Sequence, residues 1–294
     1  MQDPQEKLKQ HQRFINNQRQ QIKRLESRVQ RLEALLEYSI SDPQVRWLVT
    51  ECEERMDATL PIYDPGRAAF HLDRYHFAAS QVVGKKVADI ACGTGYGTEI
   101  LLHAGADSVI GIDIDAEAVA YASRQHDGRG RKSTSQSAGV LPVESQDPES
   151  GIAHGDESSG QPHGTGIEFR CRPGQDTGIE SESLDVVVSF ETIEHVENDQ
   201  ELLAEFKRIL RPGGQLVIST PNQWPLEIAR FHRKEYDLQE FRRVLEDHFR
   251  ILRICNQNSG TDFEFNRGQK RGIIETNGEN ADLAECFLAI AEKV

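Results

Sequence analysis

The sequence predicts an α/β fold: a parallel, doubly wound sheet with helices on both faces. From residue 84 onward, short apolar runs with strand character alternate with amphipathic helical segments. That alternation is typical of β-α-β units, in which helices connect parallel strands. Two further observations support it: a glycine-rich turn directly follows the first apolar run, and an aspartate stands twenty residues beyond Gly93 in that turn.

Each predicted strand is a short apolar run, and each predicted helix has apolar residues at helical spacing. The expected strands are 86–91, 108–114, 167–171, 184–190, 215–220, 250–255 and 285–291. The expected helices are 67–82, 98–104, 116–124, 199–210 and 238–245, preceded by a short helix at about 43–56. We therefore divide the chain into a segment at 1–40, a helical lead-in at 41–83 and the main domain at 84–294.

The first forty residues carry a heptad repeat. Apolar residues seven apart are Leu8, Ile15, Ile22, Val29 and Leu36, with Leu25 and Leu32 in the companion positions. One helix cannot bury such a seam alone, so the repeat predicts a coiled-coil helix and a homo-oligomer formed through it. A long solvated helix that packs on its own domain is the alternative.

A polar insertion interrupts the main domain at about 127–166. Its forty residues include eight glycines and seven serines but no aromatic residue. Such a segment cannot bury enough surface to offset the entropy of ordering it. We expect a disordered insertion, with a loop that gates the substrate as the alternative; a second polar stretch, 256–280, is also expected to be a loop.

Charge and cysteine usage narrow the partners and the location. The formal net charge is −14, which argues against a nucleic-acid partner because phosphate binding needs clustered Lys and Arg. Five cysteines with no CxxC pair indicate free thiols in a reducing compartment. Without a signal-peptide core or a long apolar run, we expect a soluble, cytoplasmic protein with no membrane association.

The chemistry is concentrated in the turn after the first strand, Val87-Ala88-Asp89-Ile90-Ala91-Cys92-Gly93-Thr94-Gly95-Tyr96-Gly97. Glycines let a backbone approach a ligand closely, and Asp113 at the end of the second strand can hold both ribose hydroxyls of a nucleoside. A dinucleotide site would need G-x-G-x-x-G, but the third glycine comes one place early. Asp89 also suits a cationic cofactor such as S-adenosylmethionine better than a pyrophosphate.

This segment resembles motif I of class I S-adenosylmethionine-dependent methyltransferases, and residues 109–113 look like motif II. Residues 183–189 and 210–216 resemble the family's fourth strand and its turn into strand five. The resemblance covers roughly residues 53–294, and its lead-in residues, 54–56 and 71–75, are similar to those of a bacterial subgroup. It implies a Rossmann-like, seven-stranded sheet whose last strand is antiparallel.

The resemblance also implies the cofactor-binding residues. Gly93 and Gly95 would flank the amino-acid end of S-adenosylmethionine, with Asp89 near its amine. Asp113 would hold the ribose, Ile114 would pack on the adenine, and Phe190 would lie near the cofactor or acceptor. The full expected set is Asp89, Ala91, Cys92, Gly93, Gly95, Asp113, Ile114 and Phe190. Either Gln175 or Asp176 would read the adenine amine.

A second group of chemically active residues follows the fourth strand, Glu191-Thr192-Ile193-Glu194-His195, and His232 precedes a later helix. If the turn is helical, Glu191, Glu194 and His195 share one face. Three interpretations compete. The histidines can act in acid–base chemistry, a divalent metal can be held by two carboxylates and two imidazoles, or the groups only brace the loop. We take His195 and His232 as catalytic candidates and assign no metal ligand.

The sequence thus predicts an enzyme that transfers a methyl group from S-adenosylmethionine, leaving S-adenosylhomocysteine, to an oxygen of a small molecule or glycan acceptor. One alternative is a metal-assisted O-methyltransferase acting on a quinone-like or RNA 2′-hydroxyl acceptor, a pattern that this motif also resembles. The other is a non-catalytic coiled-coil scaffold with a relic cofactor fold.

Overall fold

A computed structural model describes residues 56–60, 62–126, 166–224, 231–260 and 269–294, together with Arg19, Ile22, Leu25, Glu26, Val29 and Glu33. The predicted helix at about 43–56, except for its last residue Met56, and nearly all of the predicted insertion lie outside these residues, as does most of the heptad segment. The six described positions of that segment are all helical and exposed.

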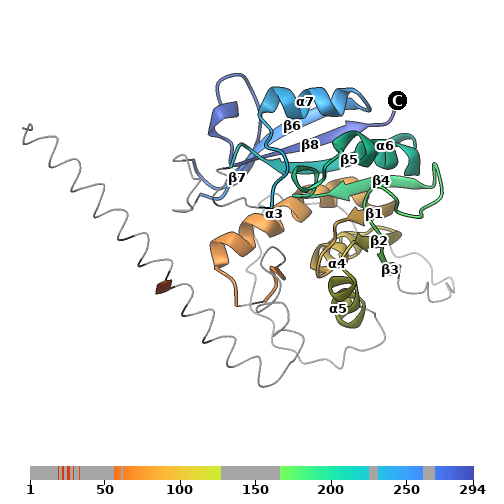
Figure 1. Cartoon of the computed structure of the whole chain (residues 1–294), viewed down its shortest axis with the longest axis horizontal. Helices are drawn as coiled ribbons and strands as arrows, with labels where there is room; N and C mark the ends of the chain where they lie inside the picture. Colours follow the sequence, from red (N-terminus) through yellow and green to blue (C-terminus); the bar gives the residue numbers. More distant parts are fainter. Residues whose placement is uncertain are drawn as a thin grey trace, which may run out of the picture.

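The core of the chain is an eight-stranded sheet in the order β3-β2-β1-β4-β5-β8-β6-β7 (Figure 1). Its strands are β1 Lys86–Ile90, β2 Ser108–Asp113, β3 Ile167–Cys171, β4 Leu184–Ser189, β5 Leu210–Pro221, β6 Arg250–Asn258, β7 Gly272–Glu275 and β8 Cys286–Glu292. The pairs β3–β2, β2–β1, β1–β4 and β4–β5 are parallel. The pairs that involve β8 and β7 are antiparallel.

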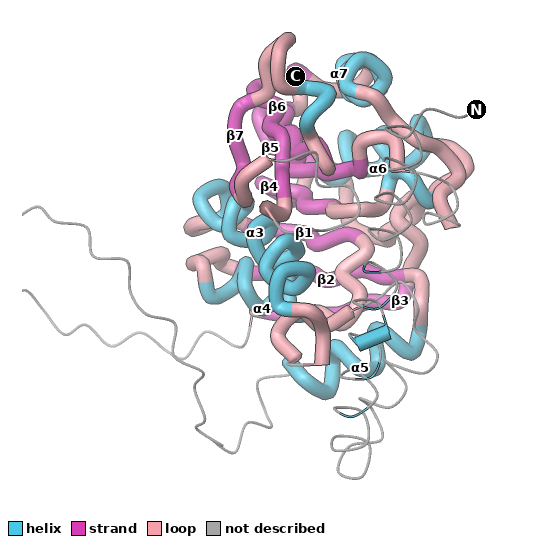
Figure 2. Tube along the Cα trace, turned by 90° about the vertical axis from the view of Figure 1, so that its left-hand side faces the viewer, coloured by secondary structure: helices cyan, strands magenta, loops and turns pink. Residues whose placement is uncertain are grey.

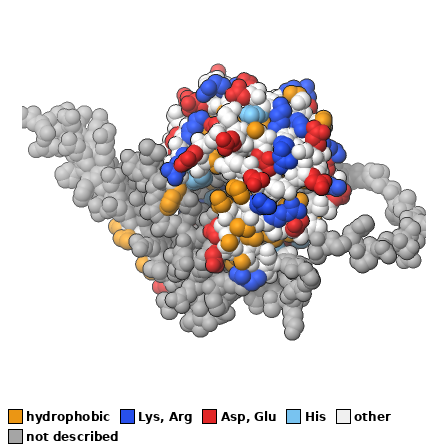
Figure 3. All heavy atoms as spheres, turned by 45° about the vertical axis from the view of Figure 1, so that its right-hand side comes forward, with side chains coloured by type: hydrophobic (Ala, Val, Ile, Leu, Met, Phe, Trp, Pro, Cys, Tyr) orange, Lys and Arg blue, Asp and Glu red, His pale blue; other side chains and the backbone are white. Residues whose placement is uncertain are grey.

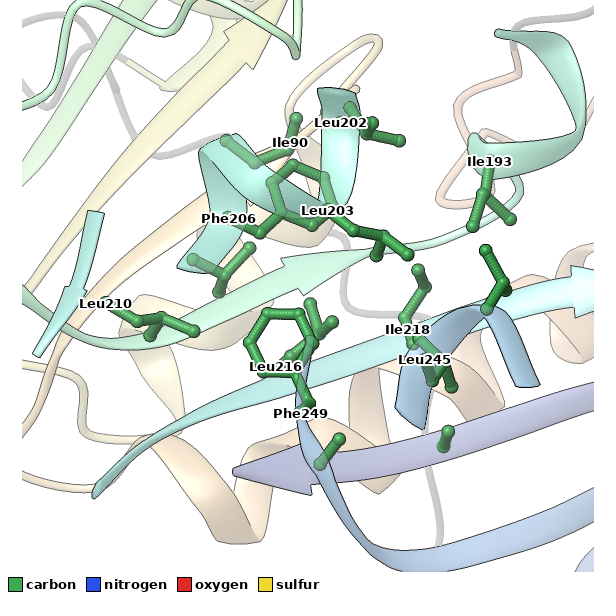
Figure 4. Close-up of a cluster of buried hydrophobic side chains, with 14 of the residues drawn as sticks. Ile90, Ile193, Leu202, Leu203, Phe206, Leu210, Leu216, Ile218, Leu245 and Phe249 are labelled. Carbon is green, nitrogen blue, oxygen red and sulfur yellow. The ribbon is translucent and has the colours of Figure 1, made fainter. Parts of the chain in front are cut away.

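Helices cover both faces of the sheet, as Figure 2 shows. They are α3 Pro65–Val82, α4 Tyr96–His103, α5 Ala116–His126, α6 Asp199–Ile209 and α7 Leu238–Glu246. One apolar core joins α6 and α7 to one face, and a second joins α3 and α4 to the other. The first core appears in Figure 4, where side chains of α6 lie against those of β5 and α7.

Local sequence explains where the helices begin. Asp64, Asn198 and Asp237 each accept a backbone N–H of the first turn of α3, α6 and α7. Such capping satisfies donors that the helix cannot pair itself. Helix α4 begins differently, because its N-cap is Gly95 in the left-handed conformation with φ of 81°. That glycine leaves the first N–H groups of α4 facing the turn that precedes it.

The sheet has one strand more than the seven predicted. The additional strand is β7, which lies inside the stretch 256–280 that was expected to be a loop and pairs with β6 at the sheet edge. The prediction of a loop was wrong there. An edge strand pairs with only one neighbour, so its sequence needs no strong alternation of apolar and polar residues. The prediction that the last strand is antiparallel is confirmed, since β8 runs against both β5 and β6.

The strand order reverses direction between β1 and β4, and this reversal fixes where a ligand can bind. From β1 the chain moves outward to β2 and β3, and then returns to β4 on the other side of β1. Connections therefore leave β1 and β4 to opposite sides and open a crevice at their carboxyl ends. The residues that follow these strands are those singled out in the sequence.

Surface features are compatible with the expected partners but identify none. On the face shown in Figure 3, Lys and Arg side chains intermingle with Asp and Glu side chains. Cys92, Cys171, Cys255 and Cys286, the cysteines in the described part of the chain, are free thiols. None of the described helices combines the length and the apolar content that a bilayer span requires.

Candidate active site

A cavity of about 880 Å³ opens at the carboxyl ends of β1, β2 and β4. Six of the eight predicted cofactor residues line it: Ala91, Cys92, Gly93, Asp113, Ile114 and Phe190. One of the two catalytic candidates, His195, also lines it. Cavities of this size hold a cofactor-sized ligand, and this one has room for an acceptor as well.

The turn after β1 is held open by its backbone geometry. Ala91, Gly93 and Gly95 have positive φ values of 64°, 55° and 81°. A side chain at Gly95 would meet Phe169 and Ala122 at less than 3 Å, so only glycine fits. Gly95 itself lies beneath the cavity wall, while Gly93 lines it. Gly95 is therefore needed for close packing, whereas Gly93 forms part of the cavity surface.

Asp113 is tied into this turn by its own carboxylate. Its Oδ2 accepts the Gly93 N–H at 2.9 Å and its Oδ1 accepts the Asp115 N–H at 2.9 Å. The side chain is almost fully buried yet lines the cavity. Both carboxylate oxygens are thereby oriented before a ligand arrives, which suits a residue expected to hold two ribose hydroxyls.

Asp89 lies one layer deeper than the cavity. It is fully buried and accepts a hydrogen bond from Thr98 Oγ1 at 2.7 Å and a longer one from the Tyr75 hydroxyl at 3.4 Å. Burial raises the pKa of Asp89 to about 7, because removal from water penalises the charged form. Its predicted contact with the cofactor amine stays a prediction.

The cavity lining separates the two candidates that the sequence left open. Gln175 lines the cavity together with Gly174 and Arg172. Asp176 does not, and its carboxylate instead lies 3.6 Å from the Arg172 guanidinium. Ile114 also lines the cavity and is 70% exposed, so it presents an open apolar surface.

Helix α3 contributes residues to the cavity that no sequence motif assigned to the site. They belong to the lead-in segment 71–75. Arg74 and Tyr75 line the cavity, and the Tyr75 ring packs edge-on against Tyr96 and Phe190 at 5.4 and 5.1 Å between centroids. Met56, before the helix, lines it too. In the sequence, these cavity residues could have been found only from the spacing of aromatic residues in the lead-in. The same spacing also fits a helix that packs on a hydrophobic core.

Arg74 and Glu191 form a buried ion pair at one wall of the cavity. The Arg74 Nη2 lies 3.3 Å from Glu191 Oε2, and Arg74 Nε donates to Gln257 Oε1 at 2.7 Å. Glu191 Oε1 accepts from Ser219 Oγ at 2.9 Å. The expected helical face shared by Glu191, Glu194 and His195 is wrong. The 3₁₀ turn spans only Ile193–His195, and Glu191 has a left-handed backbone that directs it to Arg74.

The two histidines do come together, although thirty-seven residues separate them in the sequence. The rings of His195 and His232 meet edge to face with centroids 4.9 Å apart. Glu194 joins them, and one potential ligand atom from each of the three lies within 4.8 Å of the others. His195 faces the cavity and His232 lies behind it.

Glu194 is the most unusual group of this cluster. It is 1% exposed, and its Oε1 has no hydrogen-bond partner among the described residues, although His195 Nε2 lies 3.8 Å away. Its Oε2 accepts from Thr220 Oγ1 at 3.3 Å. Burial first, and the neighbouring Glu191 second, hold the pKa of Glu194 well above its ordinary value. A buried oxygen without a partner is available to a proton or a cation.

The strand order and the cofactor turn define the class of this protein: Rossmann-like methyltransferases that use S-adenosylmethionine. A family model described as a methyltransferase domain matches residues 63–265. Because that match covers more than half of the 294 residues, the chain belongs to the methyltransferase domain family.

Named relatives agree with this family. The chain is 28% identical over 178 residues to a protein of Mycolicibacterium smegmatis named a probable S-adenosylmethionine-dependent methyltransferase, covering 58% of this chain and 54% of that one. It is 27% identical over 157 residues to a ubiquinone biosynthesis O-methyltransferase of Actinobacillus pleuropneumoniae, covering 52% of each. The chain thus spans little more than half the length of these relatives.

Solved structures show the same fold. An S-adenosylmethionine-dependent methyltransferase from Mesorhizobium loti superposes with a TM-score of 0.51 at 17% identity, covering 78% of this chain and 100% of that one. A geranyl diphosphate methyltransferase in complex with S-adenosylmethionine gives a TM-score of 0.53 at 17% identity, covering 78% and 86%. At such identity, the likeness establishes the fold alone.

The buried Asp89 carboxyl makes stability depend on pH in a defined direction. Because its pKa is raised in the folded state, the folded state holds the proton that the unfolded state has released. The free energy of unfolding therefore decreases as the pH rises from about 4 to about 7, the pKa values of Asp89 in the unfolded and folded states. Between pH 5 and pH 8 we expect the unfolding free energy to fall by about 3 kcal/mol from Asp89.

Urea denaturation of Asp89→Asn at both pH values checks this expectation. The variant should lack the part of the decline that Asp89 causes, while Asp107→Asn, at an exposed site just before β2, should keep it. Identical pH dependence in Asp89→Asn and the wild type would contradict the assignment.

Proposed function

We propose that this chain methylates a hydroxyl oxygen of a small molecule or sugar acceptor. The observation that carries the proposal is the pair of imidazoles beside the buried Glu194, of which His195 lines the cavity. Methyl transfer to a hydroxyl releases a proton, and a histidine can accept one near neutral pH. Methylation of an already nucleophilic amine or thiolate would have less use for such a cluster.

Hydrogen bonds favour one tautomer for both histidines. His195 Nδ1 lies 3.3 Å from the carbonyl oxygen of Phe231, which can only accept. His232 Nδ1 lies 2.5 Å from Glu235 Oε1, a carboxylate oxygen. Each Nδ1 is therefore assigned the proton, which leaves the Nε2 lone pair of each ring free. Of the two, His195 lines the cavity and is the base in this proposal.

S-adenosylmethionine supplies a reactive sulfonium methyl group when bound, so the chain's own task is positioning and the exclusion of water. Asp113 would orient the ribose, Ile114 and Gln175 would surround the adenine, and Phe190 would stand between cofactor and acceptor. Tyr75 and Tyr96 enclose the same region with aromatic surface. Together these groups would direct the methyl group toward an acceptor hydroxyl beside His195, whose Nε2 would take the hydroxyl proton.

Calorimetric titration of S-adenosylhomocysteine tests the cofactor side. We expect micromolar binding by the wild type, and a loss of about 2 kcal/mol, roughly 30-fold in affinity, in Asp113→Ala because hydrogen bonds to a charged acceptor are removed. Asp107→Ala, an exposed residue just before the start of β2, should bind as the wild type does. Equal affinity in both variants would refute the ribose assignment.

A second candidate is metal-assisted O-methylation, and the mutual approach of Glu194, His195 and His232 favours it. Two imidazole nitrogens and one carboxylate oxygen suit a divalent transition metal, and the unpartnered Glu194 Oε1 fits a ligand role. A cation held there would lower the pKa of an acceptor hydroxyl. The candidate set has three residues, because Glu191 is held by Arg74 instead.

Titration with Co²⁺ separates the two candidates. If the cluster holds a cation, the wild type should bind one equivalent, and Glu194→Gln should weaken that binding at least tenfold while its affinity for S-adenosylhomocysteine is unchanged. Glu201→Gln, a cavity carboxylate outside the cluster, should bind Co²⁺ as the wild type does. If the wild type takes up no Co²⁺, the acid–base mechanism without metal stands.

We also propose that the chain self-associates through its N-terminal heptads. Ile22, Leu25 and Val29 are helical, spaced three and four apart, and 51 to 61% exposed, which supports an apolar stripe available to a second copy. Leu25→Glu in the full chain should therefore lower the mass measured by light scattering, as should removal of residues 1–38. An unchanged mass in both would rule out this mode of assembly.

A further inference from the structure

We infer that Glu235 is the positioning residue of the active site, because it fixes the tautomer and the orientation of His232. The inference rests on the proposed function of the histidine pair. Glu235 lies outside the cavity, and no motif in the sequence drew attention to it. One of its carboxylate oxygens accepts a hydrogen bond from the imidazole, and the other accepts one from a backbone N–H.

The hydrogen bonds of Glu235 leave His232 little freedom. Oε1 accepts from His232 Nδ1 at 2.5 Å, and Oε2 accepts from the Trp224 backbone N–H at 2.9 Å. Both side chains are well shielded, with 7% exposure for His232 and 20% for Glu235. Because the backbone bond anchors the carboxylate, the carboxylate in turn holds the ring in one orientation.

Trp224 completes this support from the other side. Its indole ring lies nearly parallel to the His232 ring, with an angle of 27° and centroids 6.2 Å apart. The indole N–H donates to the carbonyl oxygen of Glu285 at 2.9 Å, which ties the indole to the residue just before β8. The imidazole is thus held by stacking on one face, by the Glu235 carboxylate at Nδ1 and by the edge of His195.

The hydrogen bond to Glu235 determines the protonation of the other ring nitrogen of His232, Nε2. With Nδ1–H donated to Glu235, the Nε2 of His232 carries no proton and is left as the acceptor atom of the ring. A carboxylate behind an imidazole serves this purpose at metal sites and at catalytic histidines alike. The arrangement therefore works whether His232 binds a cation or shares a proton with His195.

The test is the tautomer of His232, measured by two-bond proton–nitrogen correlation NMR on the full chain and assigned with His232→Asn. The wild type should show the Nδ1–H form, and Glu235→Gln, which keeps an acceptor oxygen, should retain it. Glu235→Ala should shift His232 toward the Nε2–H form. Glu246→Gln, which removes one exposed carboxylate charge from α7, should change nothing.

Co²⁺ titration adds a second readout: Glu235→Ala should weaken binding by roughly 10- to 100-fold, with the affinity for S-adenosylhomocysteine unaltered. A wild type in the Nε2–H form overturns the inference even if the alanine variant fails to fold. An unshifted tautomer in a folded Glu235→Ala overturns it as well. If the wild type binds no Co²⁺, the metal-assisted function fails, while the tautomer still decides the role of Glu235.

Discussion

Parallel pairing of β2, β1 and β4 is the constraint on which the site depends. Parallel strands end at the same edge of a sheet, so Ala91, Asp113 and Phe190 come together although they are spread over a hundred residues. The reversal of strand order between β1 and β4 then keeps the connecting segments from filling the space between them. The backbone contributes further, because Ala91 and Glu191 both adopt left-handed conformations just after these strands. Such strained residues are tolerated where surrounding structure holds them, and both line the cavity.

The ion pair between Arg74 and Glu191 connects the lead-in helix to this edge. A guanidinium that is 1% exposed needs partners, and Arg74 finds them on three elements: Glu191 after β4, Gln257 on β6 and Cys286 on β8. Removing one partner would leave a buried charge uncompensated, so α3 and the sheet are bound to a common geometry. The same pair withdraws Glu191 from the histidines. Charge pairing thereby distinguishes two nearby glutamates: Glu191 braces the fold, and Glu194 lies beside the two histidines.

Buried carboxylates with raised pKa values occur at both ends of the site. Asp89 lies under the cofactor turn and Glu194 beside the histidines, and burial is the main cause of the shift in each. A protein tolerates such groups at a cost in stability, and they concentrate where function uses them. Glu235 differs, because its carboxylate is satisfied by His232 and the Trp224 amide. The site therefore combines two buried carboxyl groups, Asp89 and Glu194, with a third, Glu235, whose two oxygens both accept hydrogen bonds.

Much of the fold followed from local pattern. Strand β3 was predicted to the residue, and β1, β2, β4 and the helices to within two residues, because short apolar runs and helical stripes are encoded locally. Strand β5 begins five residues earlier than predicted, since residues 210–214 were read as a turn. The glycine-rich turn was equally readable, since glycines at fixed spacing and an acid at the end of the next strand lie within thirty residues; its role in binding the cofactor stays a prediction. Strand β7 was missed because an edge strand has a weak pattern of its own.

The sequence by itself determined the fold class, the family and the position of the glycine-rich turn, all of which depend on residues close together in the chain. Tertiary structure alone decided which glutamate joins the histidines, which of Gln175 and Asp176 lines the cavity, and that Glu235 supports His232. Those outcomes depend on buried charges finding partners across the fold, such as Arg74 reaching Glu191 from more than a hundred residues away. Pairing at that separation is set by the packing of α3 on the sheet, and no local spacing encodes it.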